Sequence, residues 1–171
     1  MGRMRCASCS FPFSKRQSCG KIKTKWKERW RDDERLYFCK IINGDIPAAK
    51  VFENEHVIAF LDISQVTKGH TLVVPKVHKE NIYELTSDIA QRVFEVVPTI
   101  ANAIREQFSP EGINILSNNG EIAGQTVFHY HMHIIPRYGK GDGFGAVWKS
   151  HQSDYTFDEL QHIAAQIKQA L

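Results

Sequence analysis

The eight-residue run FHYHMHII, residues 128–135, constrains the fold of this chain more than any other feature. Its polar positions are three histidines at intervals of two: His129, His131 and His133. Successive side chains of a β-strand point to opposite faces, so a strand over 127–136 places the three imidazoles on one face, roughly 6.5 Å apart. The intervening apolar side chains then face a core. Because burying three imidazoles without partners is costly, the histidine face predicts a functional site.

Four shorter apolar runs predict further strands. We expect these strands at 50–52, 56–62, 69–75 and 113–116. The run 56–62 is apolar on both faces, which predicts a central strand. Short links between the first three runs favour antiparallel pairing. With the helices described next, the pattern predicts an α+β fold.

Three segments have the apolar spacing or end signals of helices. A short helical turn over 36–43 ends at an Asn-Gly pair. The longest segment, 87–108, repeats apolar residues at steps of three and four, with Ser87 as the expected N-cap and Pro98 as an expected kink. The last segment, 156–171, opens with the capping box Thr-Phe-Asp-Glu.

Positive charge is concentrated at the N-terminus. Residues 1–35 hold 11 Lys and Arg against 4 Asp and Glu, a net charge of +7, and the rest of the chain holds the other 11 against 15, a net charge of −4. We expect residues 1–35 to be a basic, disordered leader or a segment upstream of the true start. A domain over 36–150 and a C-terminal helical extension over 151–171 follow. The mildly acidic domain lacks the excess of positive charge that is typical of nucleic-acid-binding domains, so we expect no nucleic acid as its partner.

Cysteine use and hydropathy narrow the class of protein further. The four cysteines are Cys6, Cys9, Cys19 and Cys39. They leave the domain almost without thiols, which argues against an extracellular disulfide framework and for a cytoplasmic protein. No stretch approaches ~18 uninterrupted apolar residues, so we expect no membrane-spanning helix.

Two kinds of chemistry suit the three histidines. Imidazole is a common zinc ligand, and it is also a nucleophile that can attack phosphorus. The loop before the histidines offers neutral donors, together with glycines that let backbone N–H groups approach an anion. Its candidate phosphate-binding residues are Asn118, Gly124, Gln125 and Thr126. Such a loop favours a phosphate pocket over a closed metal cage.

Ordered motifs across residues 36–150 resemble the histidine triad family, within its Hint-like branch and among its small bacterial members. The motifs are FCKII from residue 38, DIP from 45, AFLDIS from 59, GHTLVVPKVH from 69, GQTV from 124 and HYHMHII from 129. The resemblance implies a five-stranded antiparallel sheet with helices, and a homodimer whose two sheets join into ten strands. It also implies a purine nucleotide as partner and no catalytic cofactor.

The resemblance assigns roles to individual residues. His131 stands at the position of the nucleophile, and His133 at that of a residue that contacts phosphate and helps to protonate the leaving group. Asp62 matches the acidic residue that takes the ribose hydroxyls, and His70 matches a pocket histidine. The phosphate loop is matched by Asn118, Gly124, Gln125 and Thr126.

Bacterial members of this family often hold a structural zinc ion, and three of its four ligand positions are matched by Cys39, His78 and His129. The fourth position is Leu36, which cannot bind a metal. A structural zinc site normally has four protein ligands, so water or Cys19 would have to complete the set. The resemblance therefore predicts a structural zinc site with an incomplete ligand set.

The expected function is cleavage at the α-phosphorus of nucleoside 5′-phosphoramidates or related adenylated compounds. A nucleotidyl-histidine intermediate on His131 would then release the nucleoside monophosphate. Two alternatives stay open. One is a nucleotide-binding interaction protein with little turnover, and the other is a zinc-dependent hydrolase that uses the three histidines as ligands.

Overall fold

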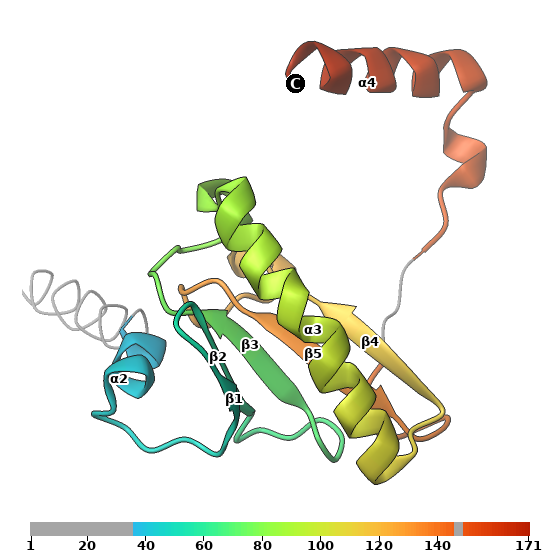
Figure 1. Ribbon diagram of the computed structural model, residues 1–171. Coiled ribbons are helices and arrows are strands. Elements are labelled where there is room, and N and C mark those ends of the chain that lie inside the picture. The colour runs from blue at the N-terminus through green and yellow to red at the C-terminus, as the bar shows by residue number, and fades with distance from the viewer. Residues whose placement is uncertain (1–35, 146–148) are drawn as a thin grey trace, which may run out of the picture.

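The computed structural model describes residues 36–145 and 149–171. The predicted leader over 1–35, with Cys6, Cys9 and Cys19, lies outside the described residues. Within them, five strands form one antiparallel sheet in the order β1-β2-β3-β5-β4 (Figure 1). The strands are β1 (Lys50–Glu53), β2 (Val57–Leu61), β3 (Thr71–Pro75), β4 (Gly112–Leu116) and β5 (Met132–Arg137). The α+β prediction with a five-stranded antiparallel sheet is confirmed.

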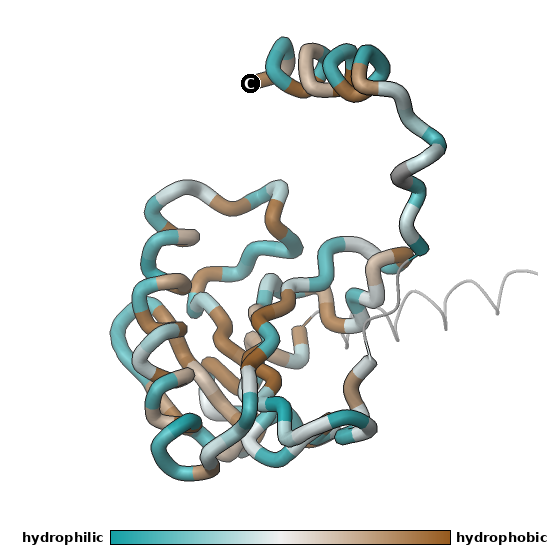
Figure 2. The backbone as a smooth tube through the Cα atoms, turned by 90° about the vertical axis from the view of Figure 1, so that its right-hand side faces the viewer, coloured by the Kyte–Doolittle hydropathy of each residue, from teal (hydrophilic) through white to brown (hydrophobic). Residues whose placement is uncertain are grey.

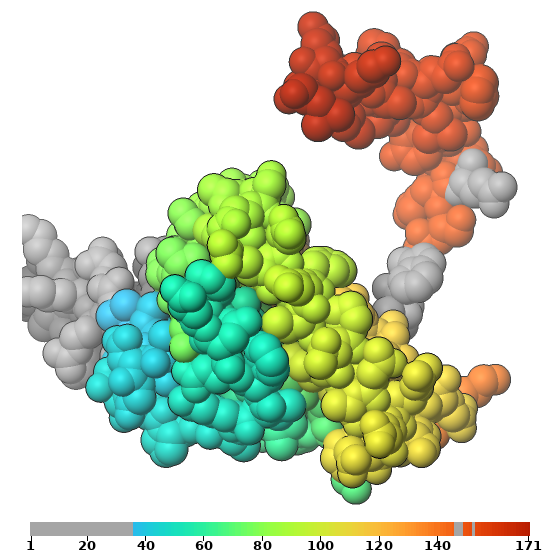
Figure 3. Space-filling model, viewed as in Figure 1, coloured from blue at the N-terminus to red at the C-terminus, as the bar shows by residue number. Residues whose placement is uncertain are grey.

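Helix α3 (Ser87–Phe108) covers one face of the sheet. Its buried side chains at steps of three and four pack against Val57, Ala59 and Val73 of the central strands. Figure 3 shows α3, in yellow-green, spread over the face that is turned to the viewer. The helix continues through Pro98. The N-cap prediction was wrong by one residue, because Thr86, whose backbone is extended, accepts the amide of Ile89 with its side chain.

Helix α2 (Tyr37–Asn43) lies on the opposite face. Phe38 and Ile41 are buried there against Phe60 and other apolar side chains of β2 and β3. The helix ends at Gly44, which has a φ of 84° and a left-handed conformation that glycine adopts without strain. Each face of the sheet therefore has its own apolar cluster, and α2 brings Phe38 and Cys39 toward the histidines.

The fifth strand is shorter than predicted. It begins at Met132, so the prediction of a strand from residue 127 was wrong. The backbone N–H of Tyr130 donates instead to the carbonyl oxygen of Lys79, 2.5 Å away, in the loop after β3. The side-chain alternation nevertheless begins before the strand. Tyr130 joins the core under α3, while His129 and His131 contact Phe38 on the other face.

The C-terminal helix α4 (Phe157–Gln169) begins with the predicted capping box between Thr156 and Glu159. None of its residues is buried. Figure 2 shows hydrophobic and hydrophilic residues alternating along it. A short 3-10 turn, η3 (Gln152–Asp154), precedes it, and two others lie in the connections after β3 and β4: η1 (Ile82–Glu84) and η2 (Glu121–Ala123). In the described part of the chain, no helix is both long and apolar enough to cross a bilayer.

Candidate active site

His131 is held by a hydrogen bond that fixes its tautomer. Its Nδ1 lies 2.7 Å from the backbone carbonyl oxygen of His129. A carbonyl oxygen can only accept, so Nδ1 carries the proton and donates it. The lone pair of the neutral ring is therefore on Nε2. The pKa of His131 is lowered, mainly because burial disfavours the charged ring. The lowered pKa keeps the ring neutral near pH 7.

Two neighbours fix the position of the His131 ring and backbone. The ring of Phe38 stands edge-on to it, with centroids 5.1 Å apart and an angle of 86° between the planes. The Ser117 hydroxyl donates to the His131 carbonyl oxygen at 3.1 Å. Packing and hydrogen bonding together restrict the movement of the imidazole and its backbone.

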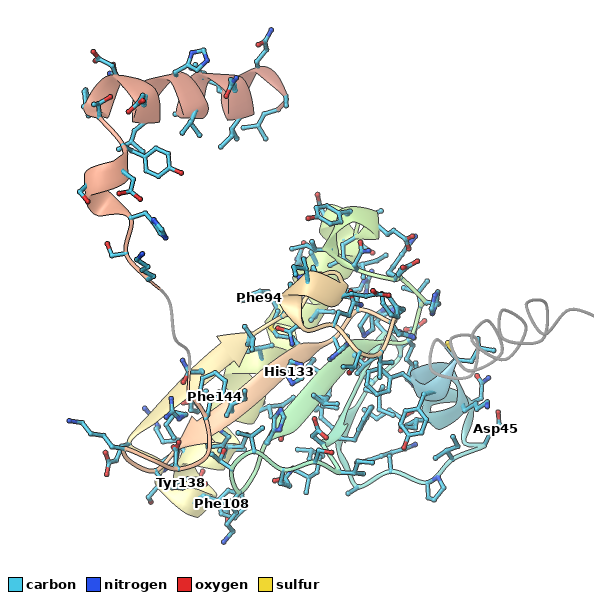
Figure 4. All side chains as sticks on the ribbon, turned by 180° about the vertical axis from the view of Figure 1, so that it is seen from behind. Asp45, Phe94, Phe108, His133, Tyr138 and Phe144 are labelled. Carbon is cyan, nitrogen blue, oxygen red and sulfur yellow. The ribbon has the colours of Figure 1, made fainter. Side chains whose placement is uncertain are left out.

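His133 forms a pair with His70 from the neighbouring strand segment. His133 Nδ1 and His70 Nε2 are 2.9 Å apart, so one ring donates to the other. His70 Nδ1 faces the Asp62 carboxylate at 3.7 Å. Figure 4 places His133 over the middle of the sheet, on the face opposite α3. Asp62, His70 and His133 thus form a connected polar row beside His131.

Burial and mutual proximity control the charge of this row. Burial, together with the nearby His131 and His70, lowers the pKa of His133 to about 4. Burial also lowers the pKa of His70, and the Asp62 carboxylate opposes that shift. His133 Nε2 and His70 Nδ1 are buried ring nitrogens without a hydrogen-bond partner among the described residues. A buried polar atom of this kind is costly unless a ligand satisfies it.

A cavity of about 580 Å³ opens beside the imidazoles. One part of its wall is apolar and comes from α2 and the central strands: Phe38, Ile41, Phe60 and Leu72. The other part is polar: Asp62, Ser64, Gln65, Thr126, His131 and His133. A pocket of this size with few convergent polar groups is suited to a small ligand that has an apolar and a charged end.

The predicted phosphate loop divides into two parts. Thr126 lines the cavity, whereas Asn118, Gly124 and Gln125 are not among its lining residues. Gln125 is buried and uses its amide inside the loop. Its Oε1 accepts the N–H of Gly120, and its Nε2 donates to the carbonyl oxygens of Glu80 and Val127. Gln125 therefore holds the loop in shape, and direct phosphate contact by Asn118, Gly124 or Gln125 stays a prediction.

The predicted zinc ligands come together at one point. Cys39 Sγ lies 3.5 Å from Nδ1 of His78 and 3.5 Å from Nδ1 of His129, and the two nitrogens are 3.3 Å apart. Zinc bonds of about 2.3 Å to sulfur and about 2.0–2.1 Å to nitrogen separate the corners of a tetrahedron by about 3.3–3.6 Å. His129 Nε2 lies 2.8 Å from the Pro75 carbonyl oxygen, so it donates and leaves the Nδ1 lone pair toward Cys39. The residues present fit a zinc ion.

The three triad histidines thus have three different sets of partners. His129 faces Cys39 and His78, His131 bonds the backbone, and His133 pairs with His70. This arrangement argues against one metal held by all three rings.

The sequence did not predict three contacts of the site: the edge-on contact of Phe38, the Ser117 hydrogen bond and the His70–His133 pair. Each joins segments far apart in the chain, so no local pattern could have revealed them.

Comparisons with known sequences agree with this geometry. The family model described as HIT domain matches residues 43–140, more than half of the chain. The Bacillus subtilis protein named "Protein hit" is 67% identical over 138 residues, which are 81% of this chain and 95% of that protein. An adenosine 5′-monophosphoramidase of Schizosaccharomyces pombe is 43% identical over 114 residues, which are 67% of this chain and 83% of that protein.

Solved structures share the fold. A crystal structure of a HIT family protein from Bacillus subtilis superposes with a TM-score of 0.77 at 68% identity, over 78% of this chain and 95% of that chain. A Zn-bound histidine triad family protein from Mycobacterium smegmatis superposes with a TM-score of 0.60 at 34% identity, over 79% of this chain and 96% of that chain. This chain therefore belongs to the HIT family.

Proposed function

We propose that this chain hydrolyses the bond between the α-phosphorus and the leaving group of nucleoside 5′-phosphoramidates or related adenylated compounds. The product is a nucleoside monophosphate, and the substrate is a purine nucleotide derivative. The Schizosaccharomyces pombe relative is named for an activity of this class. The proposed location is the cytoplasm.

The observation that carries the proposal is the hydrogen bond from His131 Nδ1 to the His129 carbonyl oxygen. It leaves the lone pair of a neutral imidazole on Nε2, in a residue that lines the cavity. His131 Nε2 attacks phosphorus and forms an N–P bond, while the bond to the leaving group breaks and its electron pair departs with that group. Water then attacks the same phosphorus and loses a proton to His133, which is neutral once it has protonated the leaving group, while the N–P bond breaks and returns its electrons to His131.

His133 supports the charge changes in both steps. Among the residues that the structure describes, its buried Nε2 has no hydrogen-bond partner, and a non-bridging phosphate oxygen can satisfy it. An anionic phosphate also favours the protonated form of a neighbouring imidazole, so substrate binding raises the pKa of His133 from its low value. The proton then lies where a departing amine needs it. Asp62 and His70 stand behind His133 as the next members of the polar row.

The two ends of the cavity suit the two ends of a nucleotide. The apolar wall that includes Ile41, Phe60 and Leu72 suits the base, and Asp62 suits the ribose hydroxyls as an acceptor. Thr126 and His133 lie at the phosphate end with His131. The reaction needs no catalytic metal. The zinc ion proposed at Cys39, His78 and His129 is structural, because it fixes α2 to the segment that carries the triad.

We also propose that two copies form a homodimer through β4. Strand β4 is one edge of the sheet, and its sequence GINIL has no charged side chain to block pairing with another strand. Ile115 and Leu116 are partly exposed on it. The other edge, β1, carries Lys50 and Glu53 and has a bulge, which are features that oppose pairing.

Trapping the intermediate tests the proposed reaction. The full chain is mixed with adenosine 5′-phosphoramidate, quenched early and digested under conditions that preserve N–P bonds. Mass spectrometry should find one adenylyl group on the peptide that contains His131. Turnover without any adduct, or an adduct on another residue, would contradict the mechanism. Tight nucleotide binding without turnover would favour the interaction protein instead.

A further inference from the structure

We infer that the metal site formed by Cys39, His78 and His129 has an open fourth position, held by water and exchangeable for a small external thiolate. This inference goes beyond the structural metal site proposed above and rests on it. It concerns a second ligand-binding position, separate from the nucleotide cavity, that none of the proposed catalytic steps uses.

The donor geometry supplies three corners of a tetrahedron. The three separations of 3.5, 3.5 and 3.3 Å agree with a site organised for one zinc-sized ion. The lone pair of His129 is already directed by its bond to Pro75. The three donor atoms already stand at the separations that a tetrahedral zinc ion requires, so the set can serve as a three-ligand platform.

The described residues offer no fourth donor. Over 36–145 and 149–171, the ligand atoms of Cys39, His78 and His129 form a group that no other Cys, His, Asp or Glu joins. One turn before Cys39, on the same side of the helix, the chain has Leu36, which is 49% exposed and has no donor atom. Within the described residues, the helix position one turn before Cys39 is therefore occupied by an apolar residue.

The site also lies at the surface. His129 is buried, Cys39 is partly buried and His78 is exposed, so water reaches the group from one side. Zinc held by three protein ligands characteristically keeps a water or an external ligand in its fourth position. A thiolate is the favoured replacement, because soft sulfur ligands bind zinc and cobalt strongly. The chemistry thus points to exchange of water for a small thiol.

Cobalt(II) substitution of the full chain tests the inference, since its absorption reports the number of bound thiolates. Four forms are compared: wild type, Leu36→Cys, Leu36→Ala as the matched control, and a variant with Cys6, Cys9 and Cys19 all changed to Ser. Each form is loaded with one equivalent of Co²⁺ under a non-ligating reductant. Each is then titrated with 2-mercaptoethanol, and circular dichroism checks that all four are folded.

We expect wild type, Leu36→Ala and the triple Ser variant to show one-thiolate spectra that shift saturably on titration. Leu36→Cys should start with a stronger thiolate band and stay unchanged. It should also bind Zn²⁺ at least about tenfold more tightly. Mutating a residue that only supports a ligand typically lowers metal affinity about 10–100-fold, and a fourth direct ligand should count for at least as much.

Three results would overturn the inference. A wild-type spectrum that does not respond to thiol means that the fourth position is closed. A thiolate band that weakens in the triple Ser variant means that an N-terminal cysteine is the fourth ligand. A folded wild type that binds no Co²⁺ means that the proposed metal site itself is wrong, which is a different failure from the first two.

Discussion

His131 owes its proposed reactivity to its neighbours on both sides. The His129 carbonyl oxygen fixes the proton on Nδ1, and Phe38 limits rotation of the ring. The sequence could predict that three histidines share one face, because alternation is a local property. It could not predict which nitrogen of His131 is free, because the tautomer depends on a backbone conformation that is not that of a regular strand.

Replacing His131, the proposed nucleophile, should abolish turnover and spare nucleotide binding. In His131→Asn the side chain keeps a polar group but has no imidazole to bond phosphorus, so kcat should fall by at least about 10³-fold. Binding of a nucleoside monophosphate, measured by calorimetry, should stay within about tenfold. Retention of more than a tenth of the wild-type kcat, which corresponds to only ~1.4 kcal/mol of barrier, would reject the assignment.

Acid should destabilise the protein partly through His133. Its pKa is about 4 in the folded chain because of burial and the nearby His131 and His70, against an ordinary value of 6.5. Between these values the unfolded chain binds a proton that the folded chain does not. Its contribution to stability is thus complete above pH 6.5 and falls toward pH 4, by at most about 1.4 kcal/mol per pH unit.

Urea denaturation at several pH values measures this slope. In His133→Gln the dependence on pH between 6.5 and 4 should be shallower than in wild type, and the Asp62 carboxylate remains in both proteins. Equal slopes in the two proteins would mean that folding does not lower the pKa of His133.

At the scale of elements, the turn before β5 depends on one buried amide. Gln125→Ala removes the acceptor for the Gly120 N–H and the donor to the Glu80 carbonyl oxygen. Leaving such groups unpaired costs about 1–3 kcal/mol, so the urea midpoint should fall clearly. Asn118→Ala is the matched control, because its amide makes one exposed bond of 3.3 Å to Gly124. An equal loss in the two variants would contradict this account of the loop.

The helices and strands differ in how well a local sequence pattern predicts them. Helix α3 could be predicted over its whole length because its apolar spacing, its cap region and its end are encoded locally. The start of β5 could not, since Tyr130 finds its hydrogen-bond partner at Lys79, some fifty residues earlier in the chain. The same reasoning covers the site. The shared face of the triad followed from local alternation, and the grouping of Cys39, His78 and His129 followed from the family resemblance. The pairing of His133 with His70, by contrast, needed the register of β3 and β5.

At the scale of the whole molecule, the proposed dimer should depend on one edge of the sheet. A charge on β4 makes pairing of two β4 strands unfavourable, so Leu116→Asp should convert a dimer into a monomer in light scattering after gel filtration. Val51→Asp, on the opposite edge strand β1 and 46% exposed, is the matched control and should leave the mass unchanged. Dissociation by the β1 variant alone would place the interface on the other edge.

Removal of bound metal should affect stability and spare the chemical step. The proposed zinc ligands Cys39 and His78 would join α2 and the loop after β3 to the triad segment, so EDTA should lower Tm by about 5 °C or more. The His129 carbonyl that orients His131 has supports of its own. His129 Nε2 donates a hydrogen bond to the Pro75 carbonyl oxygen. The backbone N–H of Tyr130, the residue after His129, donates to the Lys79 carbonyl oxygen.

His131 should therefore keep its tautomer without metal, and kcat measured well below the lowered Tm should stay within about twofold. Both quantities are measured on the same chelated sample, before and after Zn²⁺ is added back. Lost kcat with an unchanged Tm, restored by zinc, would show that the metal takes part in the reaction. Lost kcat together with a lowered Tm would instead show that metal holds the triad segment in its active conformation, because the bonds to Pro75 and Lys79 would then be too weak to do so alone.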